Sequence, residues 1–182
     1  MRRPINIILG FVLGAGLAAA SDQPPASASL LRLLLSEVQA GTMASEQYCA
    51  LVFADRRIHF EKATRKMGKD KDRKVYESQL SEGDWNALNT ILDDKGLREL
   101  RLPQGVPPLV IEDAHTIAIS ISRDTKYQNM EFLDNKSRKP YEARLKPLLG
   151  WWKSQRSGHM TASTAAPDPK CSLDNAHGVF SQ

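Results

Sequence analysis

The segment LSEGDWNALNTILDDKG, residues 80–96, carries a complete set of helix signals and constrains the fold more than any other part of the chain. Ser81 is a natural N-cap, and Asp84 follows three residues later in the arrangement of a capping box. Gly96 is typical of a residue that ends a helix. An apolar stripe lies between these signals at helical spacing and consists of Trp85, Leu88, Ile91 and Leu92. The sequence therefore predicts an amphipathic helix whose stripe packs on a neighbouring element.

Segments with the pattern of β-strands lie on both sides of this helix. They are found at residues 48–54, 58–64, 74–80, 115–122 and 127–133. In the fourth segment, Ile117, Ile119 and Ile121 alternate with small or polar residues, which is typical of a half-buried strand. Polar turns join most neighbouring segments and indicate hairpins.

Two further helices are predicted, one before the strands and one after them. Leucines recur through residues 30–39, which we interpret as a helix that ends at Gly41. The last helix covers residues 140–154 and is expected to kink or restart at Pro147. Together the elements predict an α+β domain, with a mostly antiparallel sheet of about five strands and helices packed on one face.

Residues 1–20 have the layout of a secretory signal peptide, with two arginines, an apolar run and a final Ala-Ala-Ala. The apolar run is shorter than the roughly 20 residues of a membrane span; an uncleaved anchor is the alternative. Residues 21–29 predict a linker, residues 30–155 a single domain and residues 156–182 a disordered polar tail. We expect an exported protein, periplasmic or extracellular, without a transmembrane segment in its mature chain.

The charge of the chain is divided into blocks. The formal net charge of +4 falls to +2 when the two arginines of the leader are removed. The most basic block, residues 63–74, carries six positive and two negative side chains. Such blocks fit a folded domain with a polarised surface better than a uniformly basic nucleic-acid binder. Export argues further against nucleic acid as the partner.

The two cysteines, Cys49 and Cys171, leave two interpretations open. Export permits a disulfide between them, which would close a very long loop. Cys49 lies in an apolar strand pattern and also fits an ordinary buried thiol. Their spacing has no metal-binding pattern, and we predict neither a metal site nor a cofactor.

The string KVYESQLSEGDWNALNTILDD, with the later isoleucine hairpin and KPLLGWWK, resembles a group of small exported bacterial domains of unknown function. The resemblance covers about residues 48–153 and rests on the order of strands and helices. It implies a sheet of hairpins interleaved with two helices. No activity is attached to that group, so the resemblance implies no functional residues.

Catalytic motifs are absent from the sequence: it has no nucleophile elbow, P-loop, dinucleotide-binding glycine motif or zinc-protease motif. His59 lies near Glu61 on the outward face of a predicted strand, where a solvated pair is expected. His115 follows Glu112 and Asp113 in a predicted exposed turn. A small hydrolase or metal-assisted enzyme that uses His59 or His115 with a nearby carboxylate is the alternative to a protein without catalytic activity.

Two features are candidates for a binding surface. A basic loop contributes Arg65, Lys66, Lys69, Lys71, Arg73 and Lys74. It fits a soluble hairpin tip or a cationic rim for a polyanion, and no aromatic residue between Phe60 and Tyr76 is available to stack on bases. Trp151 fits either packing at the edge of the core or an exposed anchor for a partner. The sequence favours a non-enzymatic domain that binds a protein or an envelope component, with polyanion binding through residues 65–74 as a further alternative.

Overall fold

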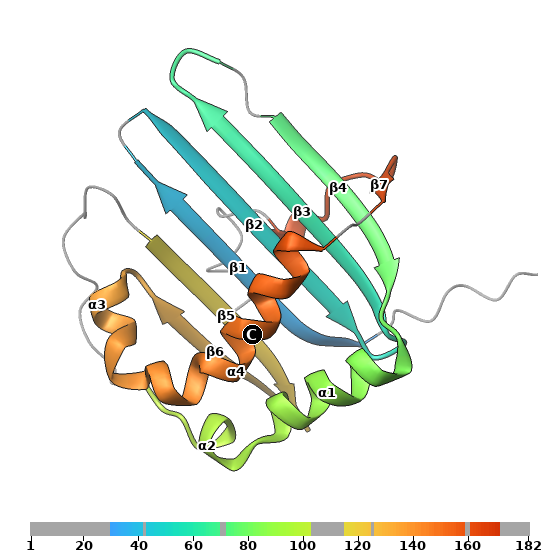
Figure 1. The fold of residues 1–182 in the computed structure, drawn as a ribbon, viewed down its shortest axis with the longest axis vertical. Helices are drawn as coiled ribbons and strands as arrows, with labels where there is room; N and C mark the ends of the chain where they lie inside the picture. The colour runs from blue at the N-terminus through green and yellow to red at the C-terminus, as the bar shows by residue number, and fades with distance from the viewer. Residues whose placement is uncertain are drawn as a thin grey trace, which may run out of the picture.

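The computed structural model shows one antiparallel sheet with helices packed against it (Figure 1). It describes residues 30–41, 43–69, 72–102, 115–124, 126–158 and 161–171. The described strands are β1 (Leu31–Ala40), β2 (Ala44–Phe53), β3 (Arg57–Lys66), β4 (Asp72–Gln79), β5 (His115–Arg123), β6 (Lys126–Phe132) and β7 (Ala162–Ser163). Their order across the sheet is β6-β5-β1-β2-β3-β4-β7. The predicted α+β class is confirmed, and the described strands number seven rather than about five.

The helices cover one face of this sheet, as predicted. They are α1 (Glu82–Asp93), α2 (Lys95–Arg98), α3 (Asn135–Arg138), the 3-10 turn η1 (Lys139–Tyr141) and α4 (Glu142–Ser157). In Figure 1, α4 crosses the face of the sheet and α1 lies across one end of it. Leu88 of α1 and Leu148 of α4 are fully buried in the same cluster as Leu35 and Ile119 of the strands. This cluster is the main hydrophobic core of the described residues.

The helix predicted from Ser81 is α1, and its start agrees with the sequence signals. The backbone N–H of Asp84 donates a hydrogen bond of 3.1 Å to Oγ of Ser81. The predicted end of this helix at Gly96 is wrong, because α1 ends before it, at its C-cap Asp94. The side chain of Asp94 accepts a hydrogen bond from the N–H of Leu97 and caps the start of the short helix α2. Gly96 lies inside α2.

The helix predicted at residues 30–39 is wrong, because this segment forms β1 in the middle of the sheet. Its leucines are buried on both faces. Leu33 and Leu35 join the main core, whereas Leu31 and Leu34 join a second cluster on the opposite face. A central strand with two covered faces reads as a near-continuous apolar run, and the weak preference of leucine for helix gives way to tertiary pairing with β2 and β5.

The last helix, α4, runs through Pro147 and does not end there, so the expected restart is wrong. The segment predicted as a disordered tail also contributes to the sheet. Residues Ala162–Ser163 form β7, which pairs with β4, and a 3-10 turn, η2 (Pro169–Cys171), follows. Cys171 is joined to Cys49 of β2 by a disulfide, which is the first of the two interpretations that the sequence left open.

Several predictions fall on residues outside the described ranges. The predicted signal peptide and linker, residues 1–29, are among them, as are Lys71, Glu112 and Asp113. None of the helices in the described part of the chain is long and apolar enough to cross a membrane.

Candidate functional site

Two hairpin ends lie side by side at the end of the sheet opposite α1 (Figure 1). The β1–β2 hairpin and the β3–β4 hairpin meet here because β2 begins where β3 ends, with Ala44 opposite Lys66. The backbone N–H of Met67 donates a hydrogen bond of 2.9 Å to the carbonyl of Met43 and links the two turns directly. We call the surface formed by Gly41, Met43 and residues 65–69 the tip surface.

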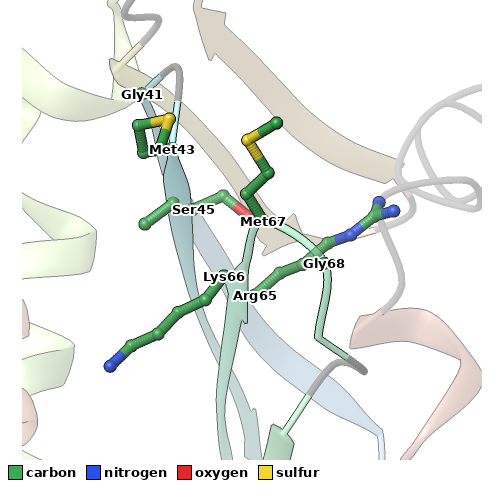
Figure 2. A pocket seen from close by; sticks show the side chains of 8 residues that line it. Gly41, Met43, Ser45, Arg65, Lys66, Met67 and Gly68 are labelled. Atoms are coloured by element: carbon green, nitrogen blue, oxygen red, sulfur yellow. The ribbon is translucent and has the colours of Figure 1, made fainter.

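Two methionines give the tip surface an apolar centre. Met43 is 66% exposed and Met67 is 72% exposed. A single exposed apolar side chain is ordinary, but here two different hairpins bring such side chains to one place. Figure 2 shows both methionines extending from the hairpin ends. They line a shallow cavity of about 250 Å³ together with Gly41, Ser45, Arg65 and Lys66.

Basic side chains surround this apolar centre. Arg65 and Lys66 point to opposite sides in Figure 2, because neighbouring residues of a strand alternate between its faces. Lys69 follows Gly68, whose φ of 71° lies in the left-handed region that favours glycine. Arg65, Lys66 and Lys69 are exposed, and none of the ion pairs between described residues involves them. The tip surface therefore combines apolar atoms with positive charge that no described carboxylate neutralises.

Four of the five described basic residues of this segment lie in strands rather than in a loop, which corrects the prediction. β3 continues through Lys66, and β4 begins at Asp72. The charged side chains of these two residues are exposed to solvent, so their place at the strand ends does not require burial of a charge. Lys74 of β4 is exposed, whereas Arg73 turns toward Glu61, with 3.4 Å between Nη1 and Oε2. The structure thus brings Arg65, Lys66 and Lys69 together at the tip surface and directs Arg73 elsewhere.

Trp151 is not part of the tip surface. It lies on α4, half-buried, and packs against the main core. Its indole Nε1 is buried, and no residue in the described ranges forms a hydrogen bond with it. The role of Trp151 as an anchor for a partner stays a prediction. Trp152 is buried in the core, as its place on the leucine face of the helix predicts.

His59 lies in a buried ion cluster on the face of the sheet opposite the helices. The expected solvated pair with Glu61 is wrong, because His59 is only 5% exposed and Glu61 only 3%. Nε2 of His59 lies 2.9 Å from Glu61 and Nδ1 lies 2.5 Å from Glu77, which the β3–β4 register places directly opposite. Both ring nitrogens are engaged, so neither is available as a general base.

The segment after α4 covers this cluster. The N–H of Asp168 donates a hydrogen bond of 2.6 Å to Glu61, and the side chain of Gln47 donates one of 2.9 Å to the carbonyl of Cys171. His59, Glu61 and Cys171 bring potential metal-binding atoms within 4.8 Å of one another. The sulfur of Cys171 is held in the disulfide and is not a thiolate ligand. We therefore interpret the cluster as structural.

Burial and ion pairing act in opposite directions on the titration of this cluster. Burial works to lower the pKa of His59, but its hydrogen bonds to Glu61 and Glu77 outweigh burial and raise the pKa above its ordinary value of 6.5. Burial works to raise the pKa of Glu61, but hydrogen bonds from His59 and Asp168 and the charge of Arg73 lower it below 4.5. The charged forms of both groups are therefore stabilised in the folded protein.

We expect the free energy of unfolding to fall as the pH rises through the folded pKa of His59. Because that pKa is raised, the stabilisation is complete below the unfolded value of 6.5 and is lost above the folded value. Urea unfolding at about pH 6 and about pH 9 measures this loss. In His59→Gln the part of the pH dependence due to His59 should disappear; an unchanged dependence in the variant would contradict the ion cluster.

Glu37 forms a second buried network, on the face covered by α4. Its carboxylate accepts hydrogen bonds from Nε1 of Trp152 at 2.5 Å and from Nη1 of Arg156 at 2.5 Å, and Nε2 of His115 lies 2.8 Å from it. Gln39 donates to the same carboxylate. Burial works to raise the pKa of Glu37, but the hydrogen bonds and the charge of Arg156 lower it. Glu37 thus carries a stabilised negative charge inside the domain.

The sequence patterns do not single out Met43, Met67 or Glu37 as functional residues. The turn signals were present, because Gly41 and Gly68 each lie within two residues of one methionine. The sequence does not indicate that these turns are neighbours, because the leucines of residues 30–39 predict a helix and therefore no β1–β2 hairpin. No family model and no curated protein matches the chain, and the resemblance to small exported bacterial domains stays a prediction.

Proposed function

We propose that this chain is an exported, non-enzymatic binding domain of the periplasm or cell envelope, and that its tip surface binds an anionic lipid surface. The observation that carries the proposal is the pairing of two exposed methionines with cations that no described carboxylate neutralises. The apolar side chains fit the boundary between lipid headgroups and acyl chains, and the cations fit anionic headgroups. The hydrogen bond from the N–H of Met67 to the carbonyl of Met43 supports a surface in which both parts lie together.

A lipid surface fits the tip surface better than a soluble polyanion does. A soluble polyanion would bind only the positive charges of the tip surface. Met43 and Met67 contribute to the binding free energy only when an apolar partner removes their exposed surface from water. Export is supported by the disulfide between Cys49 and Cys171, because such bonds persist in oxidising compartments.

The alternative of a small hydrolase has less support. Both ring nitrogens of His59 are engaged by carboxylates inside a covered cluster. His115 does lie within hydrogen-bond distance of Glu37, at the edge of a cleft. Glu37, however, already accepts from Trp152 and Arg156, and no hydrogen bond between His115 and a hydroxyl nucleophile is present among the described residues.

The proposal predicts binding to vesicles of phosphatidylglycerol and phosphatidylcholine, and weak binding to phosphatidylcholine alone. Lys66→Gln with Lys69→Gln should weaken binding about 30-fold, because each cation near an anionic surface contributes about 1 kcal/mol. Met43→Ser with Met67→Ser should weaken it by about tenfold or more at every salt concentration, since the apolar contribution is not screened. Co-sedimentation with the vesicles measures both effects.

Matched controls come from exposed residues elsewhere. Lys126→Gln with Lys136→Gln removes the same charge from β6 and α3, and Leu30→Ser removes an apolar side chain that is 77% exposed at the other end of β1. These variants should bind as the unchanged protein does. The role of the tip surface would be contradicted if the control variants lost as much vesicle binding as the tip-surface variants. It would also be contradicted if the methionine variant bound vesicles at high salt as tightly as the unchanged protein does.

A further inference from the structure

A second, independent site lies between α4 and the helix-covered face of the sheet. Its floor is made by Glu37 of β1, Tyr48 of β2 and Lys62 of β3. α4 contributes Trp152, Lys153 and Arg156 along one side. The cavity has a volume of about 410 Å³, which is within the range of small-molecule sites. We call it the α4 cleft.

The charges that line the α4 cleft are predominantly positive. Lys62, Arg138, Lys153 and Arg156 line it together with His115, and the one carboxylate among the lining residues is Glu37. That carboxylate is occupied by donors from Trp152, Arg156 and His115. Arg156 also lies over the ring of Tyr48, with 4.0 Å from Cζ to the ring centre. Glu37 therefore balances Arg156 and has no acceptor capacity left for the other cations.

The remaining cations have few partners in the described part of the chain. Lys62 lies 5.3 Å from the ring centre of Tyr48 and near Glu46. Lys153 forms no ion pair with any described carboxylate. Nη1 of Arg138 is buried and has no hydrogen-bond partner among the described residues, although another nitrogen of the same group donates to Asn135. Arg138 and Lys153 therefore line the cleft without a described carboxylate as an ion-pair partner.

We propose that the α4 cleft binds a small ligand through a phosphate group. Arg138 and Lys153 are placed to donate to the phosphate oxygens, in the charge-assisted hydrogen bonds that arginine and lysine form with such groups. Ile117 and Leu149 supply an apolar wall for the rest of the ligand. The site is separate from the tip surface, because the two share no lining residue.

The probe is inorganic phosphate, titrated into the full chain while the indole and backbone signals are followed by NMR. The indole N–H signal of Trp152 and the backbone signals of Arg138 and Lys153 should shift together and saturate. Arg138→Gln and Lys153→Gln should each weaken binding by about tenfold or more, since each removes a charged hydrogen bond. Lys146→Gln removes an exposed lysine of the same helix that does not line the cleft, and it should bind as the unchanged protein does.

A parallel titration with glycerol phosphate distinguishes the sources of the phosphate group. Tighter binding than that of inorganic phosphate supports a headgroup-like ligand that contacts the apolar wall, and equal binding supports free phosphate. The absence of saturable shifts in the cleft would overturn the proposal, as would a loss in Lys146→Gln equal to that in Lys153→Gln. Vesicle binding through the tip surface is unaffected by either outcome, since Arg138 and Lys153 lie outside it.

Discussion

Reduction of the disulfide between Cys49 and Cys171 is expected to lower the free energy of unfolding by about 4–5 kcal/mol. The bond joins residues separated by 122 positions, and the loss of loop-closure entropy in the unfolded chain grows with this separation. Both cysteines are buried in the second apolar cluster, so reduction also loosens the segment that covers the His59 cluster. Urea unfolding in the presence and absence of dithiothreitol measures the change.

The double variant Cys49→Ser with Cys171→Ser is the control for the reductant. Its unfolding midpoint should lie close to that of the reduced protein and should not respond to dithiothreitol. Identical midpoints for the oxidised and reduced unchanged protein would show that the bond contributes nothing to stability, in conflict with the structure.

Replacement of Glu37 by alanine is expected to cost about 3–5 kcal/mol of unfolding free energy, the usual effect of removing one partner from a buried ion pair. The loss arises because the buried indole N–H of Trp152 and the guanidinium of Arg156 lose the carboxylate that they share as acceptor. Glu37→Gln keeps the shape but not the charge, and should be less destabilising. Chemical denaturation at neutral pH measures both changes.

Glu131→Ala is the matched control, because this glutamate is exposed on β6 and its removal should change the unfolding free energy by less than about 0.5 kcal/mol. A Glu37→Ala protein as stable as the control would mean that the carboxylate is dispensable. That result would contradict the description of Glu37 as the centre of a buried network.

The parts of the fold that the sequence predicts correctly are those with local signals. α1 begins where Ser81 places it, because an N-cap depends only on residues within one turn of helix, although Asp84 accepts from the hydroxyl of Ser81 and does not complete the predicted capping box. β5 follows the alternation of Ile117, Ile119 and Ile121, which reports directly on one buried face, although Ala118 and Ser120 of the face predicted as exposed are buried as well. Neither prediction required knowledge of distant contacts.

β1 could not be predicted from local signals, because its conformation depends on contacts with distant parts of the chain. Leucines at 33, 34 and 35 fit a helix in isolation. They form a strand because β2 and β5 pair with both of its edges and because an apolar cluster covers each of its two faces. The same error hid the β1–β2 hairpin and, with it, the meeting of Met43 with Met67.

The charged clusters depend on register, which the sequence does not supply. His59 meets Glu77 because the β3–β4 pairing places them opposite each other, although 18 positions separate them. Glu37 meets Trp152 across 115 positions because α4 crosses the sheet above β1. The basic character of residues 65–69, in contrast, was visible in the sequence, and the structure adds the apolar side chains beside it.

Hydrogen–deuterium exchange on anionic vesicles tests the central proposal most directly, because it locates the membrane contact without any substitution. Bound protein should exchange more slowly than free protein at residues 43–45 and 65–69, with no change in α1 or along α4. Slower exchange at Trp151 and its neighbours on α4, or bound protein whose two hairpin ends exchange as fast as in solution, would contradict binding through the tip surface.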